Sequence, residues 1–309
     1  MYAVRGRRGA KVDLVTVVYG KELPQLAVQA KSIEKYLDPE KIGNIFVVIN
    51  DEKEEECFDT FYSKIIKNYG SKQGLVRPLG VSMFANGALI SVPGYISQQA
   101  LKLLSAEFCT SDHYLALDAK NFFIRTTSKA DFFAEDGTPY CKYGLFEGAK
   151  HKILQNYYDL FRVADNRRTN KLPAMMTPFV LYRNHVLNLP PYVELFSKTD
   201  FLKTFLFDVK PQSEFLLYVT YLISLGVDPN TIYREVRSLS TTLWPSMASG
   251  RPALENHFKY AIANRVPMFG LHRGRALNMS PDEQQSFHQF LVELDLASDD
   301  EPRFWMPLP

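Results

Sequence analysis

Two hydrophobic patterns alternate along the N-terminal part of the chain, and this alternation constrains the fold more than any other feature. Residues 12–19 read VDLVTVVY, a nearly continuous apolar and β-branched run that is typical of a strand buried on both faces of a parallel sheet. Apolar runs at residues 45–49 and 75–78 predict two more strands. Between them, apolar residues recur at helical spacing over residues 23–37 and 58–69. This order predicts parallel crossovers and a sheet covered by helices on both faces.

The alternation ends after Arg125, and the later segments are predicted one by one. Helices are expected over residues 149–163, 201–207 and 214–225, the last with Ser213 as its N-cap. A late strand is expected at residues 268–271. Ser280 and Glu283 have the spacing of a capping box and predict a C-terminal helix to residue 294, followed by a docked tail. We expect a basic arm at residues 1–11, a main domain at 12–275, and the helix with its tail at 276–309.

The composition excludes several classes of protein. Hydrophobic residues make up 46% of the 309 residues, and the net charge of +2 gives no global reason to expect nucleic acid as a partner. The basic cluster around Arg5 and Lys11 indicates at most peripheral membrane contact. Three cysteines without a CxxC pair argue against a disulfide framework or a structural zinc site. The N-terminus lacks the apolar core of a signal peptide, so we expect a cytoplasmic protein.

Residues 113–125, HYLALDAKNFFIR, are the strongest candidate for a functional motif. An apolar run stops abruptly at Asp118, and a second apolar run follows Lys120. Open α/β sheets bind ligands at the carboxyl ends of their strands, so a carboxylate at this position is well placed to meet one. The alternative is that Asp118 only opens a tight turn. Neither GxGxxG nor GxxxxGK[ST] occurs, which argues against a dinucleotide dehydrogenase or a P-loop enzyme.

The segment before this motif predicts a helix with one polar face. Over residues 93–107, Gln98, Gln99 and Lys102 share a face with Tyr95. Two amides and an ammonium beside a phenol suit sugar hydroxyls or phosphate oxygens. A solvated helix face is the alternative interpretation.

The order of these motifs resembles the glycosyltransferases of the GT-A fold. In that class a short apolar strand ends in Asp-x-Asp, whose carboxylates hold a divalent cation on the diphosphate of a nucleotide sugar; the similar stretch here is YLALDAKNFFI. More narrowly, the chain resembles a poorly characterised bacterial glycosyltransferase-like family through GYISQQALKL, MTPFVLY, SEFLLYVTYL and the late His-Arg pair. The resemblance implies a GT-A-like three-layer α/β sandwich, with a mostly parallel central sheet flanked by helices and a helical C-terminal extension.

This chain departs from the Asp-x-Asp pattern at Lys120, because an ammonium cannot bind magnesium or manganese. Three arrangements are open. Asp118 binds the metal with another ligand such as His272; or Lys120 and Arg273 neutralise the diphosphate without a metal; or the site is degenerate and only binds a sugar or nucleotide. In the first two, positive charge stabilises the leaving nucleoside diphosphate.

Other positions have both a functional and a structural interpretation. Tyr19 can stack on a base or pack in the core. Asp51 can accept from a nucleobase or ribose, or it can belong to a turn. Glu214, in the first turn of a helix, can be a general base or a carboxylate favoured by the helix dipole.

We therefore expect a glycosyltransferase that moves a sugar from a nucleotide sugar to a saccharide or other hydroxyl acceptor, with surface polysaccharide synthesis as its expected role. The expected catalytic residues are Asp118, Lys120 and Glu214; those expected to bind the donor are Tyr19, Asp51, Gln98, Gln99, Lys102 and Arg273; and Asp118 and His272 are the candidate ligands of manganese or magnesium. The alternatives are a non-catalytic nucleotide- or sugar-binding protein and a nucleotidyltransferase. The nucleotidyltransferase is disfavoured because the segment after the first strand has one glycine and one lysine, Gly20 and Lys21.

Overall fold

The computed structural model describes residues 11–84, 88–236, 238–301 and 304–308. Its centre is a five-stranded sheet with the order β3-β2-β1-β4-β9. The strands β1 (Val12–Val18), β2 (Ile42–Ile49), β3 (Val76–Gly80) and β4 (His113–Asp118) are parallel, and β9 (Phe179–Tyr182) is antiparallel to β4. The mostly parallel α/β sheet predicted from the sequence is confirmed.

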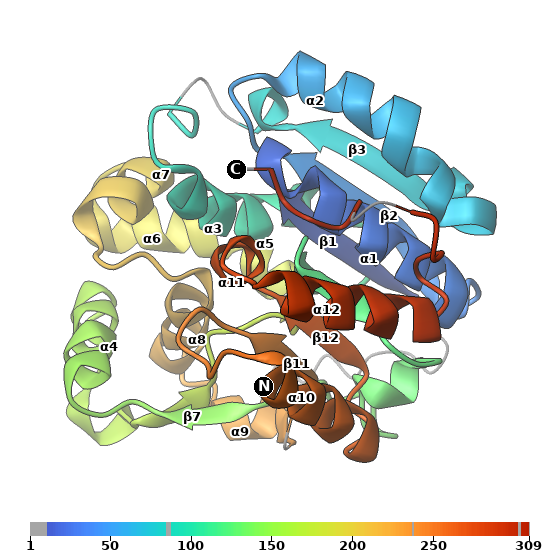
Figure 1. The fold of residues 1–309 in the computed structure, drawn as a ribbon. Coiled ribbons are helices and arrows are strands. Elements are labelled where there is room, and N and C mark those ends of the chain that lie inside the picture. Colours follow the sequence, from blue (N-terminus) through green and yellow to red (C-terminus); the bar gives the residue numbers. More distant parts are fainter. Residues whose placement is uncertain (1–10, 85–87, 237, 302–303, 309) are drawn as a thin grey trace.

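Helices cover both faces of the sheet, as the continuous apolar strands require (Figure 1). Val15 and Val17 of β1 face a core shared with α3 (Gly94–Leu104) and α8 (Glu214–Ser224). Leu14 and Val18 point the other way, into a core shared with α1 (Leu23–Tyr36) and α2 (Glu54–Thr60). Because successive side chains of a strand alternate between faces, both sets of β1 residues are buried. The result is the predicted three-layer arrangement.

The apolar stripe at residues 58–69 does not form the single helix that its spacing predicts. Here α2 ends at Thr60, a π-helical segment (Phe61–Ile65) follows, and a 3₁₀ segment (Ile66–Leu75) contains a break at Gly70, whose φ is +48°. Phe61, Ile65 and Tyr69 are nonetheless buried. The stripe therefore identified these three buried side chains, whereas Tyr62, which it also includes, is 57% exposed because the number of residues per turn changes along it.

A second, smaller sheet lies beside the first. It has the order β11-β12-β5 and contains β11 (Ser240–Leu243), β12 (Met268–Leu271) and β5 (Asn121–Phe123), with β12 antiparallel to β5. The chain therefore leaves the central sheet immediately after Asp118. The sequence predicted β12, whereas β9, β11 and α10 (Arg251–Ala263) were not predicted.

The remaining elements connect or cover these sheets. The segment at residues 166–178 contains a short strand, β8 (Lys171–Pro173), paired with β7 (Tyr143–Leu145). The others are η1 (Gly20–Glu22), η4 (Val81–Met83), η5 (Ser105–Glu107), η6 (Lys129–Asp131), β6 (Tyr140–Cys141), α4 (Ala149–Leu160), η7 (Asp165–Arg167), α5 (Arg183–Leu187), α6 (Leu189–Ser197), α7 (Phe201–Lys203), η8 (Thr204–Asp208), α9 (Pro229–Ile232), β10 (Arg234–Glu235) and α11 (Arg273–Leu277).

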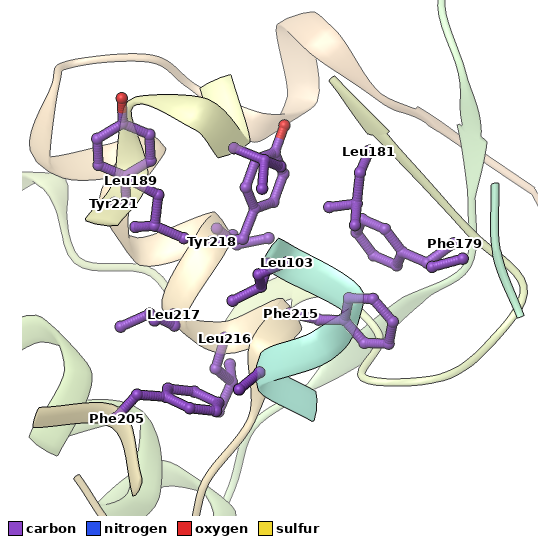
Figure 2. Close-up of a cluster of buried hydrophobic side chains, with 14 of the residues drawn as sticks. Leu103, Phe179, Leu181, Leu189, Phe205, Phe215, Leu216, Leu217, Tyr218 and Tyr221 are labelled. Carbon is purple, nitrogen blue, oxygen red and sulfur yellow. The ribbon is translucent and has the colours of Figure 1, made fainter. Parts of the chain in front are cut away.

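Helix α8 is buried on every side and carries many of the labelled apolar side chains of the core (Figure 2). Its residues from Glu214 to Ile223 are all buried, and Phe215 stacks on Phe179 of β9 with ring centroids 4.4 Å apart. The predicted N-cap is confirmed, since the hydroxyl of Ser213 accepts from the amide of Leu216 at 3.3 Å. The first residue of the helix, Glu214, is therefore a buried carboxylate.

The C-terminal part packs on α1 and the small sheet. The capping box of Ser280 and Glu283 starts α12 (Pro281–Glu293) as predicted. The tail is anchored by Trp305, which is 1% exposed and lies 4.7 Å from the ring of Phe287. Residues 1–10 of the expected basic arm lie outside the described residues. Within the part of the chain that the structure describes, no helix combines the length and apolar character needed to cross a membrane.

Candidate functional site

The carboxyl ends of the parallel strands meet at one edge of the sheet and border a cleft of about 1290 Å³. Tyr19 follows β1, Asp51 follows β2, Gln98 comes from α3, and Arg273 follows β12. These four residues, all expected from the sequence to bind the donor, line this one cleft. Parallel pairing of β1, β2 and β4 explains why segments distant in the sequence come together here.

Asp118, at the end of β4, accepts four hydrogen bonds. Its Oδ1 accepts from Gln98 Nε2 at 2.9 Å and from Lys102 Nζ at 2.6 Å. Its Oδ2 accepts from Thr177 Oγ1 at 2.8 Å and from the ammonium of Lys120. Burial raises the pKa of Asp118, but the ammonium groups of Lys102 and Lys120 outweigh it and hold this pKa well below its usual range. The carboxylate is therefore ionised and satisfied by protein groups.

Lys102 lies between two carboxylates inside the protein. Its Nζ is 3.0 Å from Glu214 Oε1, and the side chains of Lys102 and Glu214 are only 4% and 6% exposed. Burial lowers the pKa of Lys102, but Asp118 and Glu214 outweigh this effect and raise it above its usual range. Lys102 therefore joins α3, β4 and α8 through one buried cation.

The turn that carries Asp118 and Lys120 is braced from beneath by Gln29 of α1. This fully buried amide donates to the carbonyls of Asp118 at 2.9 Å and Asn121 at 2.8 Å, and it accepts from the hydroxyl of Thr16 at 2.8 Å. The side chain of Asn121 closes the turn by accepting from the amide of Asp118 at 3.0 Å. These bonds fix the direction of both charged side chains.

Thr177 was not predicted as a site residue, although it lies in the MTPFVLY stretch. Phe179 pairs with Ala116 across the antiparallel β9 and β4. Continuing this register places Thr177 opposite Asp118, where its hydroxyl bonds the carboxylate. Only the direction of β9, which the sequence did not reveal, makes this contact predictable.

Lys120, Trp244 and His272 lie together at one end of the small sheet, and none of the three lines the cleft. The Nζ of Lys120 lies 5.3 Å from the centroid of the Trp244 ring, and that ring is 5.2 Å from the ring of His272. The Nδ1 of His272 accepts from the amide of Gly274 at 3.0 Å. Burial first, and then the charge of Lys120, lower the pKa of His272, so its ring is neutral near pH 7.

Glu22 is a second residue that the sequence reasoning missed. It ends η1 directly after β1 and lines the cleft. Burial and the charge of Asp118 raise its pKa, while Lys120 and Arg273 oppose this shift. The sequence did contain a signal for Glu22, because a charged residue shortly after the first strand is expected to lie near the carboxyl edge of the sheet.

The remaining predicted donor-binding residues divide between the cleft and local structure. Asp51 lines the cleft, and its Oδ2 accepts from the amide of Gly20 at 2.9 Å. A Cβ on Gly20 would lie 2.6 Å from that oxygen, so any larger residue here would displace the carboxylate of Asp51. The amide of Gln99 instead donates to the carbonyl of Tyr95 at 3.1 Å, and Gln99 does not border the cleft.

The predicted metal ligands do not fit a divalent cation well. Both oxygens of Asp118 already accept two donors each, and two of the four donors are ammonium groups. His272 uses its Nδ1 within the backbone of α11. Among the residues described here, no group of three His, Cys, Asp or Glu side chains is arranged to hold a metal ion. The site's positive charge comes instead from lysine and arginine.

A family model matches residues 11–236, which include the central sheet and the Asp118 motif. The chain belongs to DUF6492, described as a family of unknown function. This region of the DUF6492 protein carries Tyr19, Asp51, Gln98 and Asp118, whereas Arg273 lies beyond the match. No curated protein matches the sequence.

Solved structures similar to this DUF6492 protein include three transferases. The galactosyltransferase LgtC, in complex with donor and acceptor sugar analogues, is 14% identical, with a TM-score of 0.49 over 95% of this chain and 99% of that one. Mouse xyloside xylosyltransferase 1 is 10% identical, with a TM-score of 0.44 over 84% and 97%. Core-mannan synthase A from Aspergillus fumigatus, in a Mn/GDP form, is 10% identical, with a TM-score of 0.41 over 77% and 75%. Similarity at this level does not transfer an activity, a substrate or a site residue to this protein.

Proposed function

We propose that this protein is a glycosyltransferase that uses a nucleotide-sugar donor. The observation that carries the proposal is the convergence of Tyr19, Asp51, Gln98 and Arg273 on one cleft at the carboxyl edge of the sheet. An aromatic ring, a carboxylate, an amide and a guanidinium supply stacking, ribose hydrogen bonding and phosphate binding, which together suit a nucleoside diphosphate. The acceptor is proposed to be a saccharide or another hydroxyl compound.

We further propose that the diphosphate is neutralised by protein cations. Lys120 and Arg273 act on the same carboxylate, Glu22, because the charge of each opposes the rise in its pKa. Positive groups fixed before the ligand arrives stabilise a leaving diphosphate without having to reorganise during the reaction. The saturated carboxylate of Asp118 supports this arrangement over one in which Asp118 holds a metal.

In this proposal Glu214 and Lys102 are positioning residues. Glu214 is 5% exposed and bonds Lys102, which in turn bonds Asp118. A carboxylate enclosed in this way is remote from an acceptor hydroxyl, so the role of general base does not fit it well. Its charge instead holds Lys102, and through Lys102 it orients Asp118.

A thermal-shift panel tests the proposal. The protein is melted with UDP, GDP, CDP and ADP and their sugars, each with and without manganese. We expect one base to raise the melting temperature and its effect to persist without manganese, because a ligand that binds only the native state stabilises it. The free sugars serve as controls. No stabilisation by any nucleotide would count heavily against the proposal.

Binding without catalysis is a second candidate, favoured by the same saturation of Asp118. A carboxylate whose oxygens all accept hydrogen bonds from protein groups can have a purely structural role. The Asp118→Ala variant separates the two functions. Loss of turnover with retained donor affinity supports a transferase, whereas binding without turnover in both proteins supports a sugar- or nucleotide-binding role.

A further inference from the structure

The C-terminal tail ends its described course at the mouth of the cleft. The backbone amide of Leu308 donates to the carbonyl of Lys21 at 2.9 Å, and the carbonyl of Leu308 accepts from Arg273 Nη2 at 3.1 Å. Glu301, Phe304 and Leu308 all line the cleft. Figure 1 shows the tail, in red, following α1 toward the end of β1. One short segment thus bridges the loop after β1 and the start of α11.

The two halves of the tail are held with different strength. Lys31 pairs with Glu301 at 2.9 Å and lies 4.2 Å from the centroid of the Phe304 ring, and Trp305 is buried. Beyond Trp305, Met306 packs against the same apolar cluster and Pro307 is buried. Leu308 is 55% exposed, and the described hydrogen bonds that hold it to the cleft wall are the two made by its backbone. Two such bonds give only a modest net stabilisation. Leu308 can therefore leave the cleft wall while Trp305 and Pro307 stay in place.

Arg273 is only partly satisfied by the tail. Its Nη2 donates to a neutral carbonyl, while its Nε is buried and has no hydrogen-bond partner among the described residues. A phosphate accepts two parallel bonds from adjacent guanidinium nitrogens and adds a full negative charge. An anionic ligand is thus a better partner for Arg273 than the tail.

We propose that Leu308 acts as an autoinhibitory strap, which occupies Arg273 in the free protein and is displaced by the phosphates of the ligand. This inference rests on the proposed function, because it assumes that Arg273 receives a phosphate. The Leu308 carbonyl takes the place of a phosphate oxygen, and the buried Pro307 anchors the strap. Ligand binding therefore includes the cost of releasing the strap.

The test compares the full chain with three variants, using UDP and inorganic pyrophosphate as probes in calorimetric titrations. One variant ends after Pro307 and lacks the strap. Leu308→Pro removes the amide that donates to Lys21, and Leu308→Ala keeps both backbone bonds as the matched control. We expect about tenfold tighter binding for the shortened chain, a smaller gain for Leu308→Pro, and no change for Leu308→Ala.

Repeating the truncation in an Arg273→Ala protein tests whether the strap acts through Arg273. In Arg273→Ala, shortening the chain is expected to give no gain, because the strap then has no guanidinium to occupy. Circular dichroism melting of each variant confirms that it is folded.

The outcomes separate the strap from the proposed function. Binding that is equal in the full and shortened chains overturns the strap alone, and weaker binding by the shortened chain shows that the tail is part of the ligand site. If neither probe binds even the shortened chain, the phosphate site fails, and both proposals fail with it.

Discussion

Two carboxylates at the same sheet edge, Asp118 and Glu22, have pKa values displaced in opposite directions. Asp118 ends β4 and accepts from four donors, and its pKa is lowered. Glu22 follows β1, is half-buried, and has a raised pKa because burial and the charge of Asp118 are only partly offset. Burial acts on both groups in the same sense, so the difference comes from the placement of cations.

The contrast distinguishes a structural carboxylate from an available one. Asp118 is the centre of a network that links α3, β4 and α8, and its charge is already balanced. Glu22 meets the cleft with an incompletely balanced charge, and the Nε of Arg273 has no hydrogen-bond partner among the described residues. A ligand is therefore expected to change the surroundings of Glu22 and Arg273 more than those of Asp118.

The strongest way to break this contrast is to remove the buried cation. Lys102→Met leaves Asp118 and Glu214 buried with less compensation, so we expect the free energy of unfolding to fall by about 3–5 kcal/mol. Urea denaturation at pH 7 measures it. Lys171→Met is the matched control, because the side chains of Lys171 and Glu235 are both 52% exposed and their pair should contribute little. A loss no larger than that of the control would show that the network is not structural.

Substituting Lys120 is expected to have a smaller effect, on ligand affinity. It tests whether this lysine binds the negative charge of the diphosphate. Lys120→Ala removes a cation beside the cleft, so we expect UDP to bind about tenfold more weakly. Chelation by EDTA should change the affinity of the wild-type protein less than this substitution does. Lys53→Ala is the control, since Lys53 lines the cleft but is 70% exposed and paired with Glu56. The reverse ranking, with EDTA more damaging, would favour the metal-dependent arrangement.

The smallest expected effect is a change in the pH dependence of stability when Glu22 is substituted. The pKa of Glu22 is raised from its usual 4.5, so its ionisation costs stability as the pH rises above that value. Glu22→Gln should therefore stabilise the protein slightly at pH 7, by less than about 1 kcal/mol, and this gain should vanish below pH 4.5.

Asp118→Asn is expected to change the stability at pH 7 in the opposite direction, by destabilising the protein. The lowered pKa of Asp118 stabilises the fold above its usual value of 3.8, and that contribution is lost as the pH falls. Glu52→Gln, an exposed neighbour on the same cleft, is the control for both variants. Destabilisation by Glu22→Gln at pH 7 would remove the distinction between the two carboxylates.

Local patterns predicted much of the fold. The continuous apolar runs of β1, β2 and β4, the cap at Ser213 and the capping box at Ser280 are each encoded within a few residues. Strand partners are not encoded in this way. The run after Asp118 was expected to continue the motif, yet β5 pairs with β12 about 150 residues later, because short apolar strands do not specify their partners.

The same limit applies to the site. Tyr19, Asp51, Gln98 and Arg273 were found because each follows a strand or lies on a polar helix face next to one. Gln99 was assigned to the same polar helix face, but its side chain does not border the cleft, and its amide donates to the carbonyl of Tyr95. Thr177 was missed because its contact with Asp118 depends on the reversed direction of β9.

The reversed direction of β9 also separates the Asp118 contact from the length of the chain before it. Strand register keeps the Thr177 hydroxyl opposite Asp118, so residues 165–170, which lie before β8, can gain or lose residues without shifting it. Insertions there are thus expected to leave the charged groups around Asp118 in place.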